Sequence, residues 1–123
     1  MALVTVIEDE PGIRMVLEIA LSDKGYQVET HNNGQAGFER LQNKPIPDLL
    51  FLDLNMPKMG GVPFVEAMRS SPQLKDIPIV ILTGSIPDPR ILPPKGTYNA
   101  VITKPFDLNE IVNIASQLIP IIK

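Results

Sequence analysis

The chain contains no cysteine and no tryptophan, only one histidine, and just 5% aromatic residues. The absence of cysteine excludes a disulfide-stapled secreted module and any zinc or iron–sulfur site built on cysteine ligands. No apolar run approaches the roughly 18–20 residues that a membrane-spanning helix needs. The N-terminus lacks the basic segment of a signal peptide. We therefore expect a cytoplasmic protein that makes no use of a membrane.

Charges of the two signs are nearly balanced. Eleven Lys and Arg residues stand against fourteen Asp and Glu residues, which gives a formal net charge of −3. The isoelectric point is near 5.0, and no basic cluster offers the surface that nucleic-acid binding requires. A length of 123 residues, of which 44% are hydrophobic, fits one globular domain. The expectation is a single acidic domain over residues 1–123 that binds no nucleic acid.

Short apolar runs alternate with segments of helical periodicity. The runs predict strands over residues 3–7, 26–30, 49–52, 79–82 and 100–103. Apolar spacing of three and four residues predicts helices over about 11–24, 33–42, around 64–68 and 108–119. The apolar faces of the first and last helices comprise Ile13, Val16, Leu17, Ala20 and Leu21, and Leu108, Ile111, Val112, Ala115, Leu118 and Ile119. This alternation indicates a doubly wound α/β fold with a parallel sheet.

Proline is abundant, with thirteen residues, and four of them fall where a helix should join the fourth and fifth strands. These are Pro87, Pro89, Pro93 and Pro94. Each proline inside a helix costs about 3 kcal/mol. We therefore expect a short or irregular segment here, with at most one turn around residues 90–92.

Polar side chains follow four of the predicted strands. Glu8 and Asp9 follow the first strand, and Asp53 ends the third. Thr83 ends the fourth strand and Lys104 the fifth. Because the carboxyl ends of parallel strands meet at one edge of a sheet, these side chains should share that edge. If the first and third strands are neighbours, Asp9 and Asp53 emerge from strands about 4.8 Å apart.

The residue types at this edge favour phosphoryl chemistry. Carboxylates brought so close repel one another unless their pKa values rise or a cation lies between them. Oxygen ligands in an open crevice suit Mg²⁺, which keeps several waters and prefers a phosphoryl partner. The Lys104 ammonium and the Thr83 hydroxyl would complete a clamp for a phosphoryl group. An Asp carboxylate can itself be the nucleophile that accepts phosphate.

This constellation resembles the receiver domain of two-component response regulators. The matching motifs are Glu8-Asp9, Asp53-Leu54-Asn55-Met56-Pro57 followed by Gly61, Thr83-Gly84, and Lys104-Pro105-Phe106. The resemblance covers essentially the whole chain. It implies a flavodoxin-like, five-stranded parallel sheet with strand order 2-1-3-4-5.

The resemblance also implies roles for the acidic residues. Asp53 would be the phosphoacceptor. Mg²⁺ would be held directly by Asp9 and Asp53, by Glu8 through water, and by Asn55 through its backbone carbonyl.

Further roles follow from the same resemblance. Thr83 and Lys104 would contact the phosphoryl group, and Lys104–Pro105 would be a cis peptide. The phosphoryl donor would be a histidine kinase or a histidine phosphotransfer protein, and an output protein would read the signal. Such a domain dephosphorylates itself slowly but is not an enzyme with an external substrate.

A surplus of isoleucine near the C-terminus leaves a weak dimer or partner contact open: Ile114, Ile119, Ile121 and Ile122.

Two departures from the family pattern bear on output. Val101 occupies the position, three residues before Lys104, where the family has an aromatic residue, and Gly60 stands where Asp is common. With the prolines of residues 87–94, Val101 predicts a non-standard output surface.

Three other functions remain open at this point. They are a phosphorylation-independent adaptor, an aspartate-based phosphohydrolase and a flavodoxin-like mononucleotide binder. The first is supported by Val101. The second usually needs an Asp-x-Asp motif after the first strand, and the third a phosphate-binding loop there; neither is present.

The single histidine and the methionines are expected to have no part in the site. His31 at a strand end is expected to be a solvated surface residue. The methionines are expected to serve as packing and loop residues: Met15, Met56, Met59 and Met68.

Overall fold

The computed structural model describes residues 2–54, 56, 58–84 and 92–119. It contains a five-stranded parallel sheet with the order β2-β1-β3-β4-β5. The strands are β1 (Leu3–Ile7), β2 (Gln27–His31), β3 (Leu49–Asp53), β4 (Ile79–Thr83) and β5 (Ala100–Thr103). The described helices are α1 (Pro11–Asp23), α2 (Gly34–Leu41), α3 (Gly61–Arg69) and α4 (Leu108–Leu118). The predicted fold class and strand order are confirmed.

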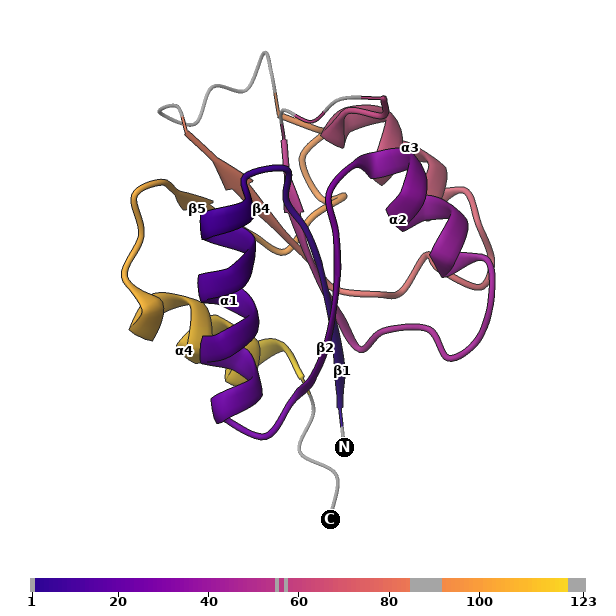
Figure 1. The fold of residues 1–123 in the computed structure, drawn as a ribbon. Helices are drawn as coiled ribbons and strands as arrows, with labels where there is room; N and C mark the ends of the chain where they lie inside the picture. Colours follow the sequence, from indigo (N-terminus) through magenta and orange to yellow (C-terminus); the bar gives the residue numbers. More distant parts are fainter. Residues whose placement is uncertain (1, 55, 57, 85–91, 120–123) are drawn as a thin grey trace.

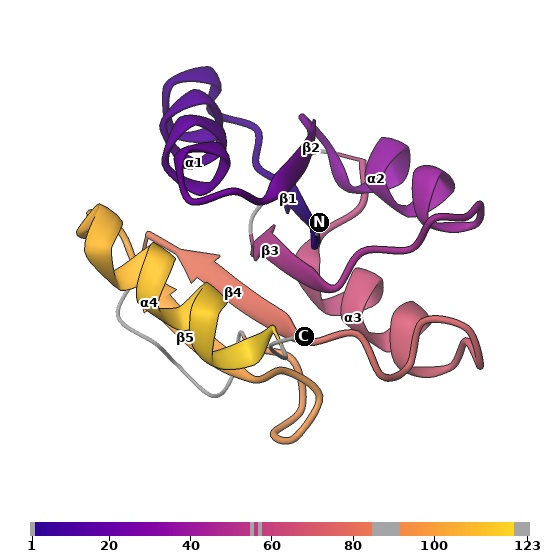
Figure 2. The same ribbon diagram turned by 90° about the horizontal axis from the view of Figure 1, so that it is seen from below.

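Helices cover both faces of the sheet. Helices α1 and α4 lie on one face, and α2 and α3 lie on the other (Figures 1 and 2). Two hydrophobic clusters fill the space between these layers and the sheet. Strands β1, β3 and β4 are buried along their whole length, whereas the edge strands β2 and β5 are partly exposed. The long apolar runs in the sequence correspond to the three central strands, because these pack on both faces.

Local signals set the helix ends. Pro11 occupies the first turn of α1, where its missing N–H has no helical partner. The chain leaves α1 through Gly25, whose φ of 94° suits glycine. The side chain of Asn33 caps α2 by accepting the Ala36 N–H at 2.8 Å. Asp107 caps α4 in the same way, since its side chain accepts a backbone N–H at 2.8 Å. All four ends lie within one or two residues of their predicted positions.

The connection between β4 and β5 is irregular where the structure describes it. Residue 84 and residues 92–99 contain no helix, which agrees with the irregular segment that the prolines predict. The turn expected around residues 90–92 falls largely outside the described residues. Leu92 and Tyr98 pack against the hydrophobic cluster on the α2–α3 side of the sheet.

Arg69, at the end of α3, holds this connection in place. Its guanidinium donates to the backbone carbonyls of Lys75 at 2.7 Å, Ile77 at 2.9 Å and Thr97 at 2.8 Å. The first two carbonyls precede β4, and the third precedes β5. One planar side chain with several donors thus joins the segments that lead into two adjacent strands.

Some helix positions are more exposed than the sequence predicts. Leu17 and Leu21 of α1 are fully buried as expected, but Val16 is 42% exposed and Met15 58% exposed. Leu108, assigned to the apolar face of the last helix, is also exposed. A helix turns about 100° per residue, so Met15 lies away from the buried stripe and Val16 at its margin. The packing role predicted for Met15 is therefore wrong.

The described helices are short. The longest, α1, has 13 residues, which corresponds to about 20 Å at the usual rise per residue. Among the described residues, no helix combines the length and the apolar character needed to cross a bilayer. At the C-terminal end, Ile119 belongs to the buried cluster on the α1–α4 side, and Ile114 packs against it. Residues 121 and 122 lie outside the described part of the chain.

Candidate functional site

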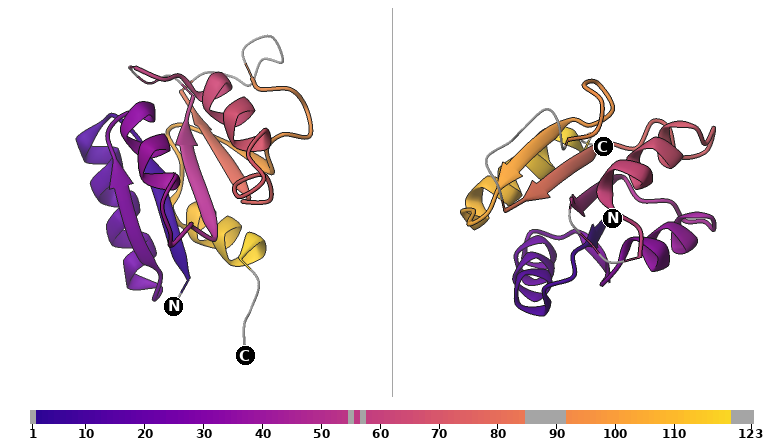
Figure 3. Two further views of the ribbon diagram at one scale, coloured as in Figure 1. Left: turned by 90° about the vertical axis from the view of Figure 1, so that its right-hand side faces the viewer. Right: turned by 90° about the horizontal axis from the view of Figure 1, so that it is seen from above.

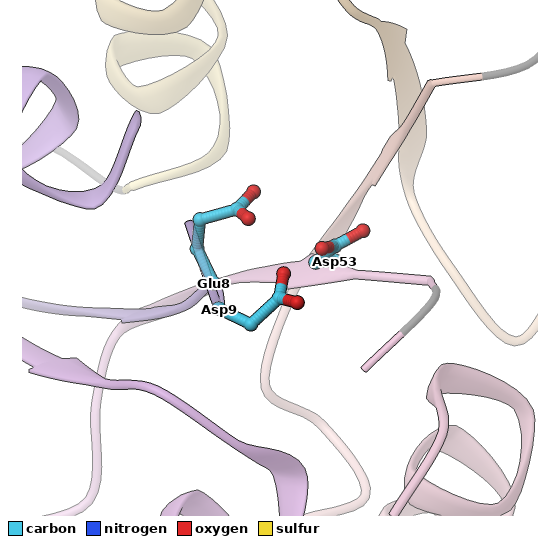
Figure 4. A group of neighbouring side chains, drawn as sticks. All are labelled: Glu8, Asp9 and Asp53. Atoms are coloured by element: carbon cyan, nitrogen blue, oxygen red, sulfur yellow. The ribbon is translucent and has the colours of Figure 1, made fainter. Parts of the chain in front are cut away.

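Three acidic side chains meet at the carboxyl edge of the sheet. Glu8 and Asp9 follow β1, and Asp53 is the last residue of β3. Strands β1 and β3 are paired, with Ile7 opposite Leu52. One carboxylate oxygen from each acidic residue lies within 4.8 Å of the others. Figure 4 shows the three side chains beside one another. The structure therefore brings together the three acidic residues that the sequence singles out.

The three carboxylates differ in their access to solvent. Glu8 is fully buried and Asp53 is 4% exposed, whereas Asp9 is exposed. The cluster is thus buried at Glu8 and Asp53 and open to solvent at Asp9. A hard divalent cation could enter there, bind carboxylate oxygens and keep some of its water ligands. The donor set, all oxygen and rich in negative charge, fits Mg²⁺.

Lys104 brings a positive charge into this cluster from the carboxyl end of the edge strand β5. It follows β5, and its Nζ lies 2.7 Å from Glu8 Oε1 and 3.5 Å from Asp53 Oδ2. The sequence prediction paired Lys104 with Asp53 and assigned Glu8 to a water ligand. The shorter ion pair is the one with Glu8, because the longer Glu side chain reaches toward β5.

The environment of Lys104 favours its charged form. Burial lowers the pKa of its ammonium, but the hydrogen bond with Glu8 and the negative charge of Asp53 raise it by more. The net result is a pKa above the ordinary lysine value. Lys104 therefore presents a permanent cation to the acidic cluster at neutral pH.

The backbone fixes Glu8 in this position. Its second carboxylate oxygen, Oε2, accepts the Glu10 N–H at 3.1 Å. Its own carbonyl accepts a hydrogen bond from Arg14 Nη1 at 2.8 Å. Its N–H donates to the carbonyl of His31 at 3.0 Å, which ties the end of β1 to the end of β2. Glu8 is thus held in place by both its side chain and its backbone.

Thr83 lies at the same edge, one strand away from Asp53. It is the last residue of β4 and is buried. In the paired strands, Asp53 stands opposite Leu82, and Thr83 stands opposite Thr103. Thr83 therefore ends β4, and Lys104 follows the adjacent strand β5, in the positions predicted from the sequence.

The loop after Asp53 is described only in part. Asn55, predicted to hold a metal through its carbonyl, lies outside the described residues. Leu54 anchors the loop, since its N–H donates to the Leu82 carbonyl at 2.9 Å and its carbonyl accepts the Gly61 N–H at 3.0 Å. Within the loop, Lys58 adopts a left-handed φ of 71°. At the other side of the site, Lys104–Pro105 is a cis peptide, as expected.

His31 is not the solvated surface residue that the sequence predicts. It ends β2 and is half-buried, and its Nε2 finds no hydrogen-bond partner among the described residues. Burial lowers the pKa of His31, and the nearby charges of Glu29 and Arg40 act in opposite directions, the first raising it and the second lowering it. Arg40 of α2 pairs with Glu29 at 3.0 Å, which holds α2 over this part of β2.

An apolar cavity lies beside Lys104. It has a volume of about 450 Å³ and lies between the start of α1 and the connection from β5 to α4. Its lining includes Ile13, Val16, Lys104, Pro105 and Phe106. The sequence did not predict this cavity, because it depends on how two segments distant in the chain pack together.

The comparisons with known proteins agree with this arrangement. A family model described as the response regulator receiver domain matches residues 4–116. The chain is 30% identical over 115 residues to response regulator Rre1 of Synechocystis sp., covering 92% of this chain and 49% of that protein. It is 30% identical over 119 residues to response regulator ArlR of Staphylococcus epidermidis, covering 89% of this chain and 48% of that protein. The chain thus spans about half the length of these relatives.

Solved structures show the same fold. The chemotaxis protein CheY4 of Vibrio cholerae matches with a TM-score of 0.86 and 30% identity, over 96% of this chain and 98% of that one. Since the family model covers most of the chain and the strand order agrees, the chain belongs to the family of response regulator receiver domains.

Proposed function

We propose that this receiver domain accepts a phosphoryl group on Asp53 from the phosphohistidine of a histidine kinase or a histidine phosphotransfer protein. The observation that carries the proposal is the convergence of Glu8, Asp9 and Asp53 with the Lys104 ammonium at one edge of the sheet. Asp9 and Asp53 would hold Mg²⁺ directly, and Glu8 would act through water.

In the proposed reaction, a carboxylate oxygen of Asp53 attacks phosphorus in line with the phosphorus–nitrogen bond of the donor. An oxygen–phosphorus bond forms, the phosphorus–nitrogen bond breaks, and the imidazole leaves with the electron pair. Lys104 neutralises charge that gathers on the phosphoryl oxygens, and the Thr83 hydroxyl donates to one of them. Mg²⁺, when bound, adds further positive charge at this point.

The surface next to the site suits a protein donor. The cavity beside Lys104 is bordered by Val16, and the neighbouring α1 residues Met15 and Ile19 are 58% and 62% exposed. Large apolar side chains exposed together mark contact surfaces for other proteins. A partner that docks on this face of α1 would present its phosphohistidine within reach of Asp53.

The phosphorylated state would be temporary. Slow hydrolysis of the acyl phosphate would end it, so the domain would act as a phosphoacceptor in the cytoplasm and not as an enzyme with a substrate of its own. The phosphorylated form would be read by an output protein.

Intact-mass spectrometry after treatment with acetyl phosphate tests the acceptor directly. We expect one added phosphoryl group in the presence of Mg²⁺, little without it, and none in Asp53→Asn. An unmodified wild-type chain, or equal labelling of the folded Asp53→Asn variant, would overturn the proposal.

A phosphorylation-independent adaptor is the second candidate, favoured by one feature. Val101 packs against the cluster on the α2–α3 side, and a valine cannot change state by turning an aromatic ring. For an adaptor, the output partner would bind wild type and Asp53→Asn with equal affinity, whether or not acetyl phosphate is present.

A further inference from the structure

The loop that follows Asp53 packs against the first residue of α2 with no room for a side chain. A Cβ atom added to Gly34 would overlap the backbone carbonyl oxygen of Met59. It would also lie 2.9 Å from Met59 Cβ and 3.0 Å from the Met59 carbonyl carbon. Because the overlapped oxygen belongs to the backbone, no rotamer change relieves the overlap. Any residue larger than glycine must displace either the loop or the start of α2.

Neither side of this contact is free to move alone. Asn33 caps α2 by accepting the Ala36 N–H at 2.8 Å. Just before it, the carbonyl of His31 accepts the Glu8 N–H at 3.0 Å. The start of α2 is therefore tied, through the end of β2, to one of the acidic residues of the site.

The loop itself is anchored at both ends. Leu54 is bonded to β4 at one end, and the Gly61 N–H closes the loop onto the Leu54 carbonyl at 3.0 Å. Space is short at this end too, since a Cβ atom on Gly61 would lie 3.0 Å from Leu54 Cα. Among the described residues, Met59 meets the start of α2 at Gly34, and Gly61 closes the loop onto Leu54.

The strand order gives this contact its place in the site. Strand β1 lies between β2 and β3 in the sheet. Gly34 follows β2 and Met59 follows β3, so their contact joins the segments on the two sides of Glu8 and Asp9. In Figure 1 the start of α2 and the segment before α3 lie side by side at the edge that carries the acidic cluster.

We propose that Gly34 is a positioning residue for the metal site. Its missing side chain lets the loop after Asp53 approach α2, and this approach sets the distance between that loop and Asp9. The inference rests on the proposed function, because it assumes that Asp9 and Asp53 bind Mg²⁺.

Gly37, one turn later in the same helix, provides a matched control. A Cβ atom there would overlap Ile7 Cδ1 and lie 3.0 Å from Ile7 Cγ1. These atoms belong to the buried side chain of Ile7 in the hydrophobic cluster, not to the backbone of the loop after Asp53. Gly37→Ala should therefore disturb packing under α2 and leave the loop in place.

The test compares Mg²⁺ binding by wild type, Gly34→Ala and Gly37→Ala with isothermal titration calorimetry. We expect Gly34→Ala to weaken Mg²⁺ binding by about tenfold, the scale at which residues outside the ligand set act on metal sites. Gly37→Ala should bind Mg²⁺ within about twofold of wild type, even if its unfolding midpoint falls further. Without metal, amide shifts of residues 58–61 should change in Gly34→Ala only.

Gly61→Ala displaces the same loop from its other end and serves if Gly34→Ala does not fold. It should weaken Mg²⁺ binding by a smaller factor. If wild type binds Mg²⁺ and the folded Gly34→Ala and Gly61→Ala variants bind it with the same affinity, the inference is overturned. The proposed function would still stand. An equal loss in Gly37→Ala would also overturn the inference, since general destabilisation would then explain the result. A wild-type chain that binds no Mg²⁺ would overturn both.

Discussion

At the residue scale, one ammonium group balances part of the charge of three carboxylates. Lys104 lies 2.7 Å from the buried Glu8 and 3.5 Å from Asp53, while Asp9 faces solvent. A buried carboxylate without a cation is costly, so the ion pair with Lys104 offsets the cost of burying Glu8. The same cation is then available to a phosphoryl group on Asp53.

Replacing Lys104 should therefore destabilise the fold. Lys104→Met leaves Glu8 buried without its cation, and we expect the free energy of unfolding to fall by about 3 kcal/mol. Urea denaturation measures this change. In a Glu8→Gln background the same substitution should cost clearly less, because the stranded charge is gone. An equal cost in both backgrounds would contradict the ion pair as the cause.

When no metal is present, replacing Asp9 should stabilise the fold, whereas replacing Lys104 destabilises it. Asp9→Asn removes one of three neighbouring negative charges, so we expect a higher unfolding temperature than wild type in EDTA. Wild type should gain about 1.4 kcal/mol when Mg²⁺ reaches ten times its dissociation constant, and Asp9→Asn much less. Calorimetry with and without Mg²⁺ measures both effects. Equal stabilisation of the two proteins by Mg²⁺ would exclude Asp9 as a ligand.

His31 should give the protein a pH dependence in the weakly acidic range. Burial lowers its pKa below the ordinary value of 6.5, so the unfolded state binds the proton more readily than the folded state. Stability is then complete above pH 6.5 and falls as the pH drops toward the folded-state pKa. Denaturation at pH 7.5 and pH 5.5 should show a smaller loss for His31→Gln than for wild type. Parallel losses would show that other groups cause the pH dependence.

At the scale of elements, side-chain hydrogen bonds hold the described part of the connection between β4 and β5 in place. The described part of the connection between β4 and β5 forms no helix, yet it leads back to β5 in register. Arg69 bonds carbonyls before both strands, and Asn99 bonds Ile79 through backbone and side chain at 2.8 and 2.9 Å. These polar contacts fix the start of β5. Lys104 follows the other end of the same strand, where it enters the site.

Loss of Arg69 should loosen this connection more than it disturbs the core. Arg69→Lys keeps the charge but cannot reach three carbonyls at once, and we expect a loss of about 2 kcal/mol in unfolding free energy. Hydrogen exchange of the Asn99 amide should accelerate, while amides in β1 and β3 follow only the global change. Uniform acceleration in all strands would argue against a local role.

At the scale of the whole molecule, topology made most of the site predictable. A parallel sheet brings every strand's carboxyl end to one edge, as Figure 3 shows from two further directions, so strand-ending residues such as Asp53 and Thr83 could be assigned to one site from their order alone. The pairing of Lys104 with Glu8 could not, because it depends on side-chain reach across several strands. Gly34 gave no signal either, since its tight contact joins the start of α2 to a loop distant in the chain. The half-burial of His31 could not be predicted either, because burial of a side chain at a strand end depends on tertiary packing.

The most direct test of the whole account identifies the residue that carries the phosphoryl group. The protein is treated with acetyl phosphate and Mg²⁺, reduced with borohydride to mark the acyl phosphate, digested, and sequenced by tandem mass spectrometry. The account predicts a single mark on Asp53 that does not form when Mg²⁺ is chelated before acetyl phosphate is added. A mark on another residue, or one that forms equally well in EDTA, would contradict it.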